Sequence, residues 1–288
     1  MVNKKTQIEN QEINDKIWSL WKEFSKKKKL PTDRVPILYP EFKRDGLLFI
    51  GLNPSFNTKK LAEFYYEIKL EECSEEKERI ENKKRKKLKN EISLKKKELE
   101  KEIGEKLEWK KENLNKKNKK LIIKLEKKAI EKYSYYKKFG KISEYVNELP
   151  WQHIDLFFIR ATKQEDLKQK ISKNGKSTNN KEVELNDFAL EQLRIVNEMI
   201  EIINPKVIIV VNALASKIIL QESNIFKISK EEVFEKKGYD YLEINNKKIP
   251  ILFSSMLTGQ RALDNHSFRT LKWQIKRILK GKISTSHD

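Results

Sequence analysis

A short apolar run that ends in a tight turn sets the strongest limit on the fold of this chain. Leu47–Ile50 is apolar at every position, and Gly51 and Pro54 close the run, so a strand here must be buried on both faces. Val207–Val211 is a second run of the same kind. Strands of this type occur in parallel sheets covered by helices, and ligands bind there at the carboxyl ends of the strands. The sequence therefore predicts an α/β fold with a central parallel four-stranded sheet.

The segments around these runs fit strands that alternate with helices. Apolar residues at helical spacing predict an amphipathic helix over 12–29. Asn186 or Asp187 is placed to cap a helix that continues to about residue 203. The other expected elements are strands at Ile154–Ile159 and Ile249–Ser254, helices at 213–220 and His266–Leu279, and a hairpin turn at Asn245–Asn246.

Residues 58–146 differ in character from the rest of the chain. Lysine and glutamate dominate, and pairs of apolar residues recur every eleven positions, a period typical of nearly straight helical packing. We therefore divide the chain into an α/β domain, 1–57 and 147–288, and a helical, coiled-coil-like insertion, 58–146. Both ends of the insertion must return to one domain, so we expect a charged helical hairpin that reverses near Gly104 or over Asn113–Asn118. Such an arm is a solvated surface, a clamp on DNA or a site for a protein partner.

Composition limits the classes of protein to which the chain can belong. The net charge of +20 favours a polyanionic partner, although the lysine bias of an AT-rich genome accounts for part of it. A single cysteine excludes a disulfide framework and a four-thiolate metal site, and we expect neither a metal nor a cofactor. Nucleotide-binding glycine loops and a hydrolase serine elbow are missing. Without an apolar leader or membrane segment, we expect a cytosolic protein.

Four segments at the ends of the expected strands share a pattern with a known family. In chain order they are Gly51–Ser55, His153–Phe157, Pro205–Ala213 and Ser254–Arg261. Their order and spacing resemble the motifs of the uracil-DNA glycosylase superfamily, and the first motif resembles that of its mismatch-specific branch, where an asparagine precedes a proline. The resemblance covers about residues 20–50 and 147–280. It implies a uracil-DNA glycosylase-like fold that flips a base of double-stranded DNA into a pocket.

The resemblance also implies roles for individual residues. Asn53 would hold the attacking water through its carbonyl oxygen, and Asp155 would read the base. The base pocket would include Gly51, Leu52, Pro54, Ser55, Phe56, His153, Phe157 and Asn212, with Asn212 at a turn that contacts phosphate. Contacts to DNA would come from Arg160, Thr258, Gly259, Gln260 and Arg261. Structural alternatives are a simple turn at Asn53–Pro54, a core position for Phe56, and an ion pair between Asp155 and Arg160.

Two departures from the family pattern bear on the substrate. The uracil readers of the family carry an asparagine, whereas an ionised Asp155 only accepts hydrogen bonds and would favour the exocyclic amine of cytosine. Met256–Thr258 stands where many members have His-Pro-Ser, so a histidine that stabilises the departing base is missing, unless His153 or His266 replaces it.

From these features we expect a monofunctional DNA glycosylase that leaves an abasic site. The sequence modestly favours a modified cytosine, such as the glucosylated hydroxymethylcytosine of phage DNA, as the excised base, and hence a role in antiphage defence. One alternative is repair of uracil or another deaminated base. An alternative of another class is a catalytically silent DNA-binding module whose helical arm binds a partner.

Overall fold

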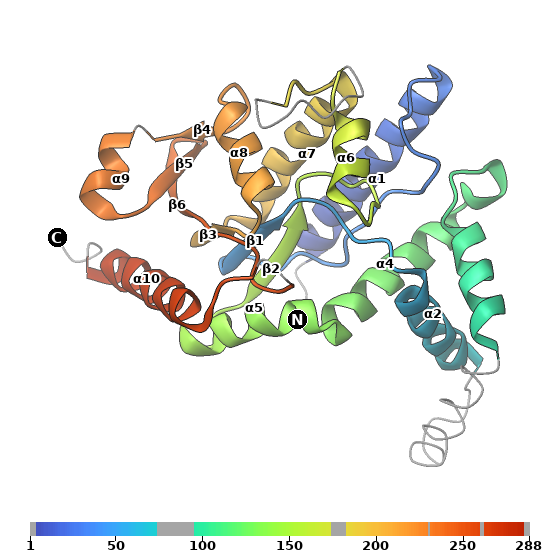
Figure 1. Cartoon of the computed structure of the whole chain (residues 1–288), viewed down its shortest axis with the longest axis horizontal. Coiled ribbons are helices and arrows are strands. Elements are labelled where there is room, and N and C mark those ends of the chain that lie inside the picture. Colours follow the sequence, from blue (N-terminus) through green and yellow to red (C-terminus); the bar gives the residue numbers. More distant parts are fainter. Residues whose placement is uncertain (1–3, 74–94, 174–182, 230, 260–261, 285–288) are drawn as a thin grey trace, which may run out of the picture.

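The computed structural model has an α/β architecture and describes residues 4–73, 95–173, 183–229, 231–259 and 262–284 (Figure 1). Two parts of the sequence predictions lie outside the described residues: residues 74–94 of the predicted helical insertion, and the predicted DNA contacts Gln260 and Arg261. Within the described residues, no helix has both the length and the apolar character that a bilayer span requires.

The described strands form one six-stranded sheet in the order β2-β1-β3-β6-β5-β4. Strands β2, β1, β3 and β6 pair in parallel, and β5 and β4 extend the β6 edge in antiparallel fashion. The predicted sheet of four parallel strands is therefore part of a larger, mixed sheet. The strands are β1 (Leu47–Gly51), β2 (Trp151–Asp155), β3 (Val207–Val210), β4 (Lys227–Ile228), β5 (Asp240–Ile244) and β6 (Lys247–Phe253).

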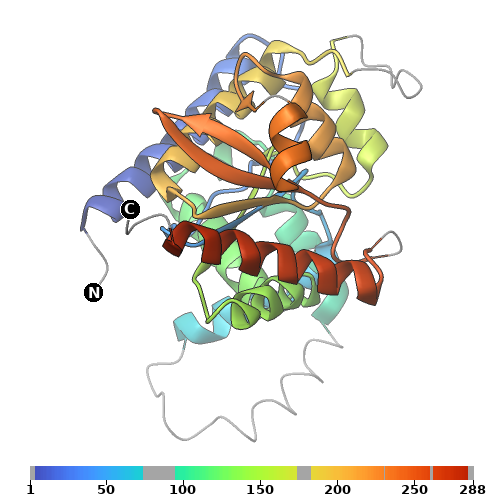
Figure 2. The same ribbon diagram turned by 90° about the vertical axis from the view of Figure 1, so that its left-hand side faces the viewer.

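Side chains of β1 alternate between two layers of helices (Figure 2). Leu48 and Ile50 are buried on the face covered by α1, α7 and α8, whereas Leu47 and Phe49 are buried on the face covered by α5 and α10. The helices outside 58–146 are α1 (Lys4–Lys26), α6 (Gln164–Ile171), α7 (Asp187–Ile203), α8 (Ala213–Gln221), α9 (Glu231–Lys237) and α10 (Asn265–Ser284).

Local capping signals account for several of these boundaries. The Asn186 side chain accepts a hydrogen bond from the backbone N–H of Ala189, which confirms the predicted start of α7. Asn245 and Asn246 have φ values of 49° and 62°, the left-handed conformation that a two-residue hairpin turn requires. The predicted hairpin between β5 and β6 is therefore confirmed.

Strand β2 ends at Asp155, so the predicted strand over Ile154–Ile159 is wrong in its length. The chain beyond Asp155 stays buried, and its backbone groups find partners outside a regular ladder. The N–H of Leu156 donates to the Gly51 carbonyl at 3.1 Å, and the N–H of Phe158 donates to Oε1 of Gln192 at 2.8 Å. These bonds satisfy the backbone of an irregular segment that crosses the core. An apolar run in the sequence looks the same whether it forms such a segment or a buried strand.

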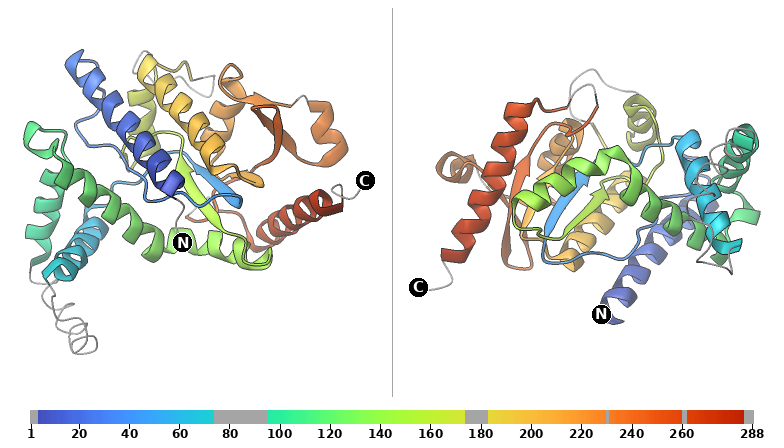
Figure 3. Two further views of the ribbon diagram at one scale, coloured as in Figure 1. Left: turned by 180° about the vertical axis from the view of Figure 1, so that it is seen from behind. Right: turned by 90° about the horizontal axis from the view of Figure 1, so that it is seen from below.

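Residues 58–146 come between β1 and β2 in the chain, and their described parts, 58–73 and 95–146, pack against the α/β part of the molecule (Figure 3). Apolar side chains from this region, such as Leu61, Ile103 and Leu125, belong to the same buried cluster as the sheet. Among the described residues the chain reverses between 106 and 116, and Gly104 lies within the preceding helix. The described elements are α2 (Thr58–Cys73), a helix over 95–106, the 3-10 turn η1 (Lys111–Asn113), α4 (Lys116–Lys132) and α5 (Ser134–Tyr145).

Candidate functional site

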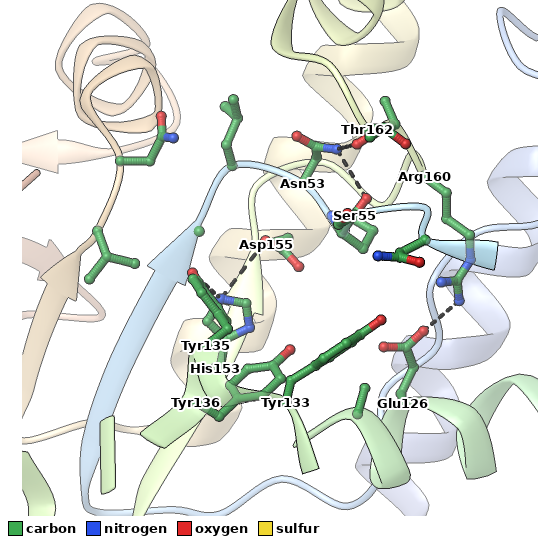
Figure 4. A pocket seen from close by; sticks show the side chains of 18 of the residues that line it. Asn53, Ser55, Glu126, Tyr133, Tyr135, Tyr136, His153, Asp155, Arg160 and Thr162 are labelled. Carbon is green, nitrogen blue, oxygen red and sulfur yellow. Dashed lines mark hydrogen bonds and ion pairs between the residues drawn. The ribbon is translucent and has the colours of Figure 1, made fainter. Parts of the chain in front are cut away.

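A cavity of about 420 Å³ lies at the carboxyl ends of β1 and β2 (Figure 4). Its walls come from the loop after β1, the segment after β2, and the junction of α4 with α5. This volume is in the range of roughly 300–1,000 Å³ that is common for small-molecule sites. The lining includes Gly51, Leu52, Asn53, Pro54, Ser55, Glu126, Tyr133, Tyr135, Tyr136, His153, Asp155, Arg160, Asn212 and Met256.

Gly51 allows two polar side chains to lie across the end of β1. Gly51 pairs with Asp155 in the parallel register of β1 and β2. A Cβ atom on Gly51 would lie 2.4 Å from Oδ1 of Asp155 and 2.9 Å from Nε2 of His153, both closer than real contacts allow. Any larger residue at position 51 would therefore displace Asp155 and His153 from the cavity.

The amide group of Asn53 is held in one orientation. Its Nδ2 donates hydrogen bonds to the carbonyl oxygens of Ala161 at 2.8 Å and Pro54 at 3.1 Å (Figure 4), and to that of Ile159 at 3.4 Å. Three acceptors on one side fix the nitrogen there, because a carbonyl oxygen cannot pair with Oδ1. No described residue donates to Oδ1, so this oxygen is an available acceptor on a residue that lines the cavity.

Asp155, His153 and Tyr135 form a buried polar cluster on the side of the cavity next to β2 (Figure 4). Nε2 of His153 lies 3.9 Å from Oδ1 of Asp155 and 3.5 Å from the Tyr135 hydroxyl. Burial raises the pKa of Asp155 well above its usual range; the charge of Glu126 adds to the rise and Arg160 opposes it. Burial also lowers the pKa of His153 to about 3. Although the two groups are close enough for a weak ion pair, burial favours the neutral form of each side chain, and this direction runs against the expected ionised Asp155.

Arg160 pairs with Glu126 of α4. Nη2 of Arg160 donates to Oε1 of Glu126 at 2.5 Å, and the arginine is only 3% exposed. The alternative ion pair between Arg160 and Asp155 is therefore not the one formed, and Arg160 lies in the cavity wall rather than on the outer surface, where we expected it to contact DNA. Its Nε has no hydrogen-bond partner among the described residues.

Three tyrosines at the α4–α5 junction form an aromatic wall that the sequence prediction missed. Tyr133, Tyr135 and Tyr136 all line the cavity, and the Tyr136 and His153 ring centroids are 5.4 Å apart. Burial raises the pKa of Tyr133 to about 12. The signal in the sequence was the concentration of tyrosine in a segment otherwise rich in lysine and glutamate. The junction therefore makes residues 58–146 part of the site.

Other predicted pocket residues have structural roles as well. Asn212 lines the cavity, but its Oδ1 caps α8 by accepting from the N–H groups of Leu214 and Ala215, so those donors are not available to a phosphate. Phe56 lies outside the cavity lining, with the Arg34 guanidinium carbon 3.6 Å from its ring centroid. Phe157 is fully buried in the core and is not part of the lining.

The loop after β6 approaches the cavity through a residue other than those predicted. Met256 lines the cavity, whereas Thr258 and Gly259 do not. Gly259 has a φ of 92°, a conformation that favours glycine. His266 is exposed at the start of α10 and does not replace the missing histidine. Within the part of the chain that the structure describes, no group of three or more acidic, histidine or cysteine side chains is placed to hold a metal ion.

Comparison of the chain with protein-family models, curated proteins and solved structures found no match. A functional assignment therefore depends on the residues of the cavity themselves.

Proposed function

We propose that the chain is a monofunctional DNA glycosylase that hydrolyses the N-glycosidic bond of a base flipped into the cavity. The observation that carries this proposal is the orientation of Asn53, whose nitrogen is held by three carbonyl oxygens while its Oδ1 accepts no bond from the described residues. An oriented acceptor beside a base-sized cavity can hold a water against the sugar of an extruded nucleotide.

The chemistry requires a water, an acceptor and a stabilised leaving group. The water oxygen forms a bond to C1′ of the sugar while the bond from C1′ to the base nitrogen breaks; the base takes the bonding electrons and gains a proton, and the water loses one. An amide oxygen is a weak base, so Asn53 positions the water instead of deprotonating it. A protonated Asp155 can donate a hydrogen bond to the departing base, which compensates in part for the absence of a histidine near Met256.

The α4–α5 junction supports the recognition of a planar ligand. Flipped bases are held by stacking on aromatic side chains and by hydrogen bonds to their edges. Tyr133, Tyr135 and Tyr136 supply rings, and Asp155 supplies both a donor and an acceptor once its carboxyl is protonated.

Cavity size supports a base that carries a substituent, such as a glucosylated hydroxymethylcytosine. A water molecule takes up roughly 30 Å³, so a cavity of about 420 Å³ has room for many water-sized groups. An unsubstituted pyrimidine ring would leave part of this volume empty. The Arg160–Glu126 pair lies in the wall across the cavity from Asp155 (Figure 4), so the two ends of the cavity differ in polar character.

Uracil or another deaminated base is the alternative substrate, and the protonation of Asp155 favours it more than the sequence did. A neutral carboxyl group can accept from the ring N–H of uracil and donate to its carbonyl, as an asparagine amide does. Asp155 therefore no longer argues against uracil, and the preference for a modified base depends on the cavity volume.

Base release from defined duplexes tests the proposal. Duplexes that contain uracil, hypoxanthine or glucosylated hydroxymethylcytosine would be incubated with wild type, Asn53→Ala, Asn53→Asp and a control, Asn224→Ala, in an exposed turn. We expect Asn53→Ala to slow base release by on the order of 100-fold. Asn53→Asp should also be slow, although a carboxylate is the better base, because its oxygen would face three carbonyl oxygens.

The outcomes separate the classes of function. Base release that is unchanged in Asn53→Ala would remove Asn53 from the mechanism. Tight DNA binding by wild type without release of any of the three bases would favour the catalytically silent DNA-binding module. Full activity of Asn224→Ala is required before the Asn53 result is interpreted.

A further inference from the structure

Helix α10 carries positive charge, and the acidic residue next to it, Asp264, caps its first turn by accepting from the N–H groups of His266 and Ser267. The segment Asn265–Gly281 contains no aspartate or glutamate, and none of its basic side chains forms an ion pair with another described residue. Lysines elsewhere on the described helices are often paired, as in the contacts of Lys69 with Glu102 and of Lys128 with Glu71. The basic residues of the segment are Arg269, Lys272, Lys276, Arg277 and Lys280.

Aromatic rings hold several of these cations at the surface. The Nζ atoms of Lys272 and Lys276 each lie 4.8 Å from the ring centroid of Tyr145 on α5. The guanidinium carbon of Arg277 lies 5.2 Å from the ring centroid of Trp273, which is 51% exposed. A ring restrains a cation without neutralising it, so its charge remains available to an anion and less side-chain freedom is lost on binding.

Helix α5 connects this surface to the cavity. Tyr136 lines the cavity near the start of α5, and Tyr145 stands nine positions later on the same helix, beside α10 (Figures 1 and 3). Nine residues of helix span about 14 Å. This distance corresponds to roughly four base pairs at about 3.4 Å each along the axis of a DNA duplex.

We propose that the α5–α10 surface, made of Tyr145, Arg269, Lys272, Trp273, Lys276 and Arg277, binds the phosphate backbone of duplex DNA beside the nucleotide that enters the cavity. The choice of DNA as the anionic ligand of this surface rests on the proposed function. A stripe of cations along one helix fits a phosphate backbone, whereas a stable protein interface has a core depleted of charge.

The salt dependence of DNA binding tests this surface. The affinity for a duplex without a modified base would be measured by fluorescence anisotropy over a range of salt concentrations. We expect the triple variant Lys272→Gln/Lys276→Gln/Arg277→Gln to lose about two to three units of the slope of log affinity against log salt, because each phosphate contact contributes about 0.9. The matched control, Lys116→Gln/Lys117→Gln/Lys120→Gln, removes the same charge from exposed positions of α4, at the opposite end of the molecule (Figure 1), and should lose less than about one unit.

Equal loss of slope in the two triple variants would overturn the proposal, since net charge alone would then explain binding. An unchanged slope in the α10 variant would also overturn it and would make an acidic protein the better partner for this surface. Both variants change exposed or half-buried surface residues, and their thermal unfolding midpoints would be compared first to confirm folding. The base-release assay is a separate measurement. If no base is released but the two triple variants still differ in their salt slopes, the glycosylase assignment is rejected and the α5–α10 surface remains a DNA-binding surface.

Discussion

At the residue scale, burial shifts the pKa values of His153 and Asp155 in opposite directions when the chain folds. In an unfolded chain between about pH 4 and pH 6.5, histidine is protonated and aspartate is ionised. In the folded protein, burial raises the pKa of Asp155 and lowers the pKa of His153 to about 3, so burial favours the protonated carboxyl group and the neutral imidazole. The two shifts have opposite effects on the pH dependence of the free energy of unfolding and offset each other in this interval.

Single substitutions of His153 and Asp155 should change the pH dependence of the free energy of unfolding in opposite directions. Asp155→Asn leaves only His153, whose folded pKa is depressed; the folded state then binds fewer protons below about pH 6.5, so stability falls on acidification by up to about 1.4 kcal/mol per pH unit. His153→Gln leaves only Asp155, whose folded pKa is raised. Its contribution is fully present below about pH 3.8 and is lost as the pH rises towards the folded pKa.

Urea unfolding between about pH 4.5 and pH 6.5 measures these slopes, with wild type as the reference for all other titrating groups. Relative to wild type, stability should rise with pH in Asp155→Asn and fall with pH in His153→Gln. Slopes of the same sign in the two variants would contradict the opposite shifts of the two pKa values.

At the scale of elements, the Arg160–Glu126 pair joins α4 to the segment that follows β2. Both side chains are almost completely buried, with 1% and 8% of their side-chain surface exposed. Removal of one member of such a pair leaves an uncompensated buried charge, which commonly costs about 3–5 kcal/mol. Arg160→Met and Glu126→Leu should each destabilise the protein by about this amount, whereas the double variant should be much less destabilised than the sum.

A double-mutant cycle by urea unfolding gives the coupling energy of this pair. The matched control is the cycle on Lys173 and Glu184, whose side chains are 51% and 64% exposed and whose charged atoms are 2.6 Å apart. We expect a coupling below about 1 kcal/mol for the exposed pair and on the order of 3 kcal/mol for the buried pair. Similar small values for both pairs would show that α4 is not anchored through Arg160.

The sequence predicted those elements whose signals are local. The cap at Asn186, the turn at Asn245–Asn246 and the buried strand β3 each depend on neighbouring residues, and each is found in the structure. The partner of Arg160 could not be predicted in this way, because Glu126 is separated from it by 34 positions and belongs to a segment read as a solvated arm. Periodicity likewise predicted helices in 58–146 but not that Tyr133 and its neighbours would face the cavity.

At the scale of the whole molecule, residues 58–146 and the sheet share one buried core. Leu107, Ile122 and Ala129 belong to the same apolar cluster as the β1 residues Leu48 and Ile50. A solvated arm would bury its apolar residues within itself and could unfold without the sheet. A shared core instead couples the two parts, because unfolding either one would expose apolar surface on the other.

Unfolding of the chain should therefore be a single cooperative transition. Trp109, in the reversal before α4, contacts Trp18 of α1 with ring centroids 5.0 Å apart, so the fluorescence of the five tryptophans includes a signal from the junction of the two parts. Far-ultraviolet circular dichroism reports all helices. The two signals should give the same urea midpoint, and amide exchange should assign similar opening free energies to α4 and β1. Loss of protection in α4 well before β1 would mean that 58–146 is an independent unit, and the tyrosine wall would then be a movable part of the cavity instead of a fixed one.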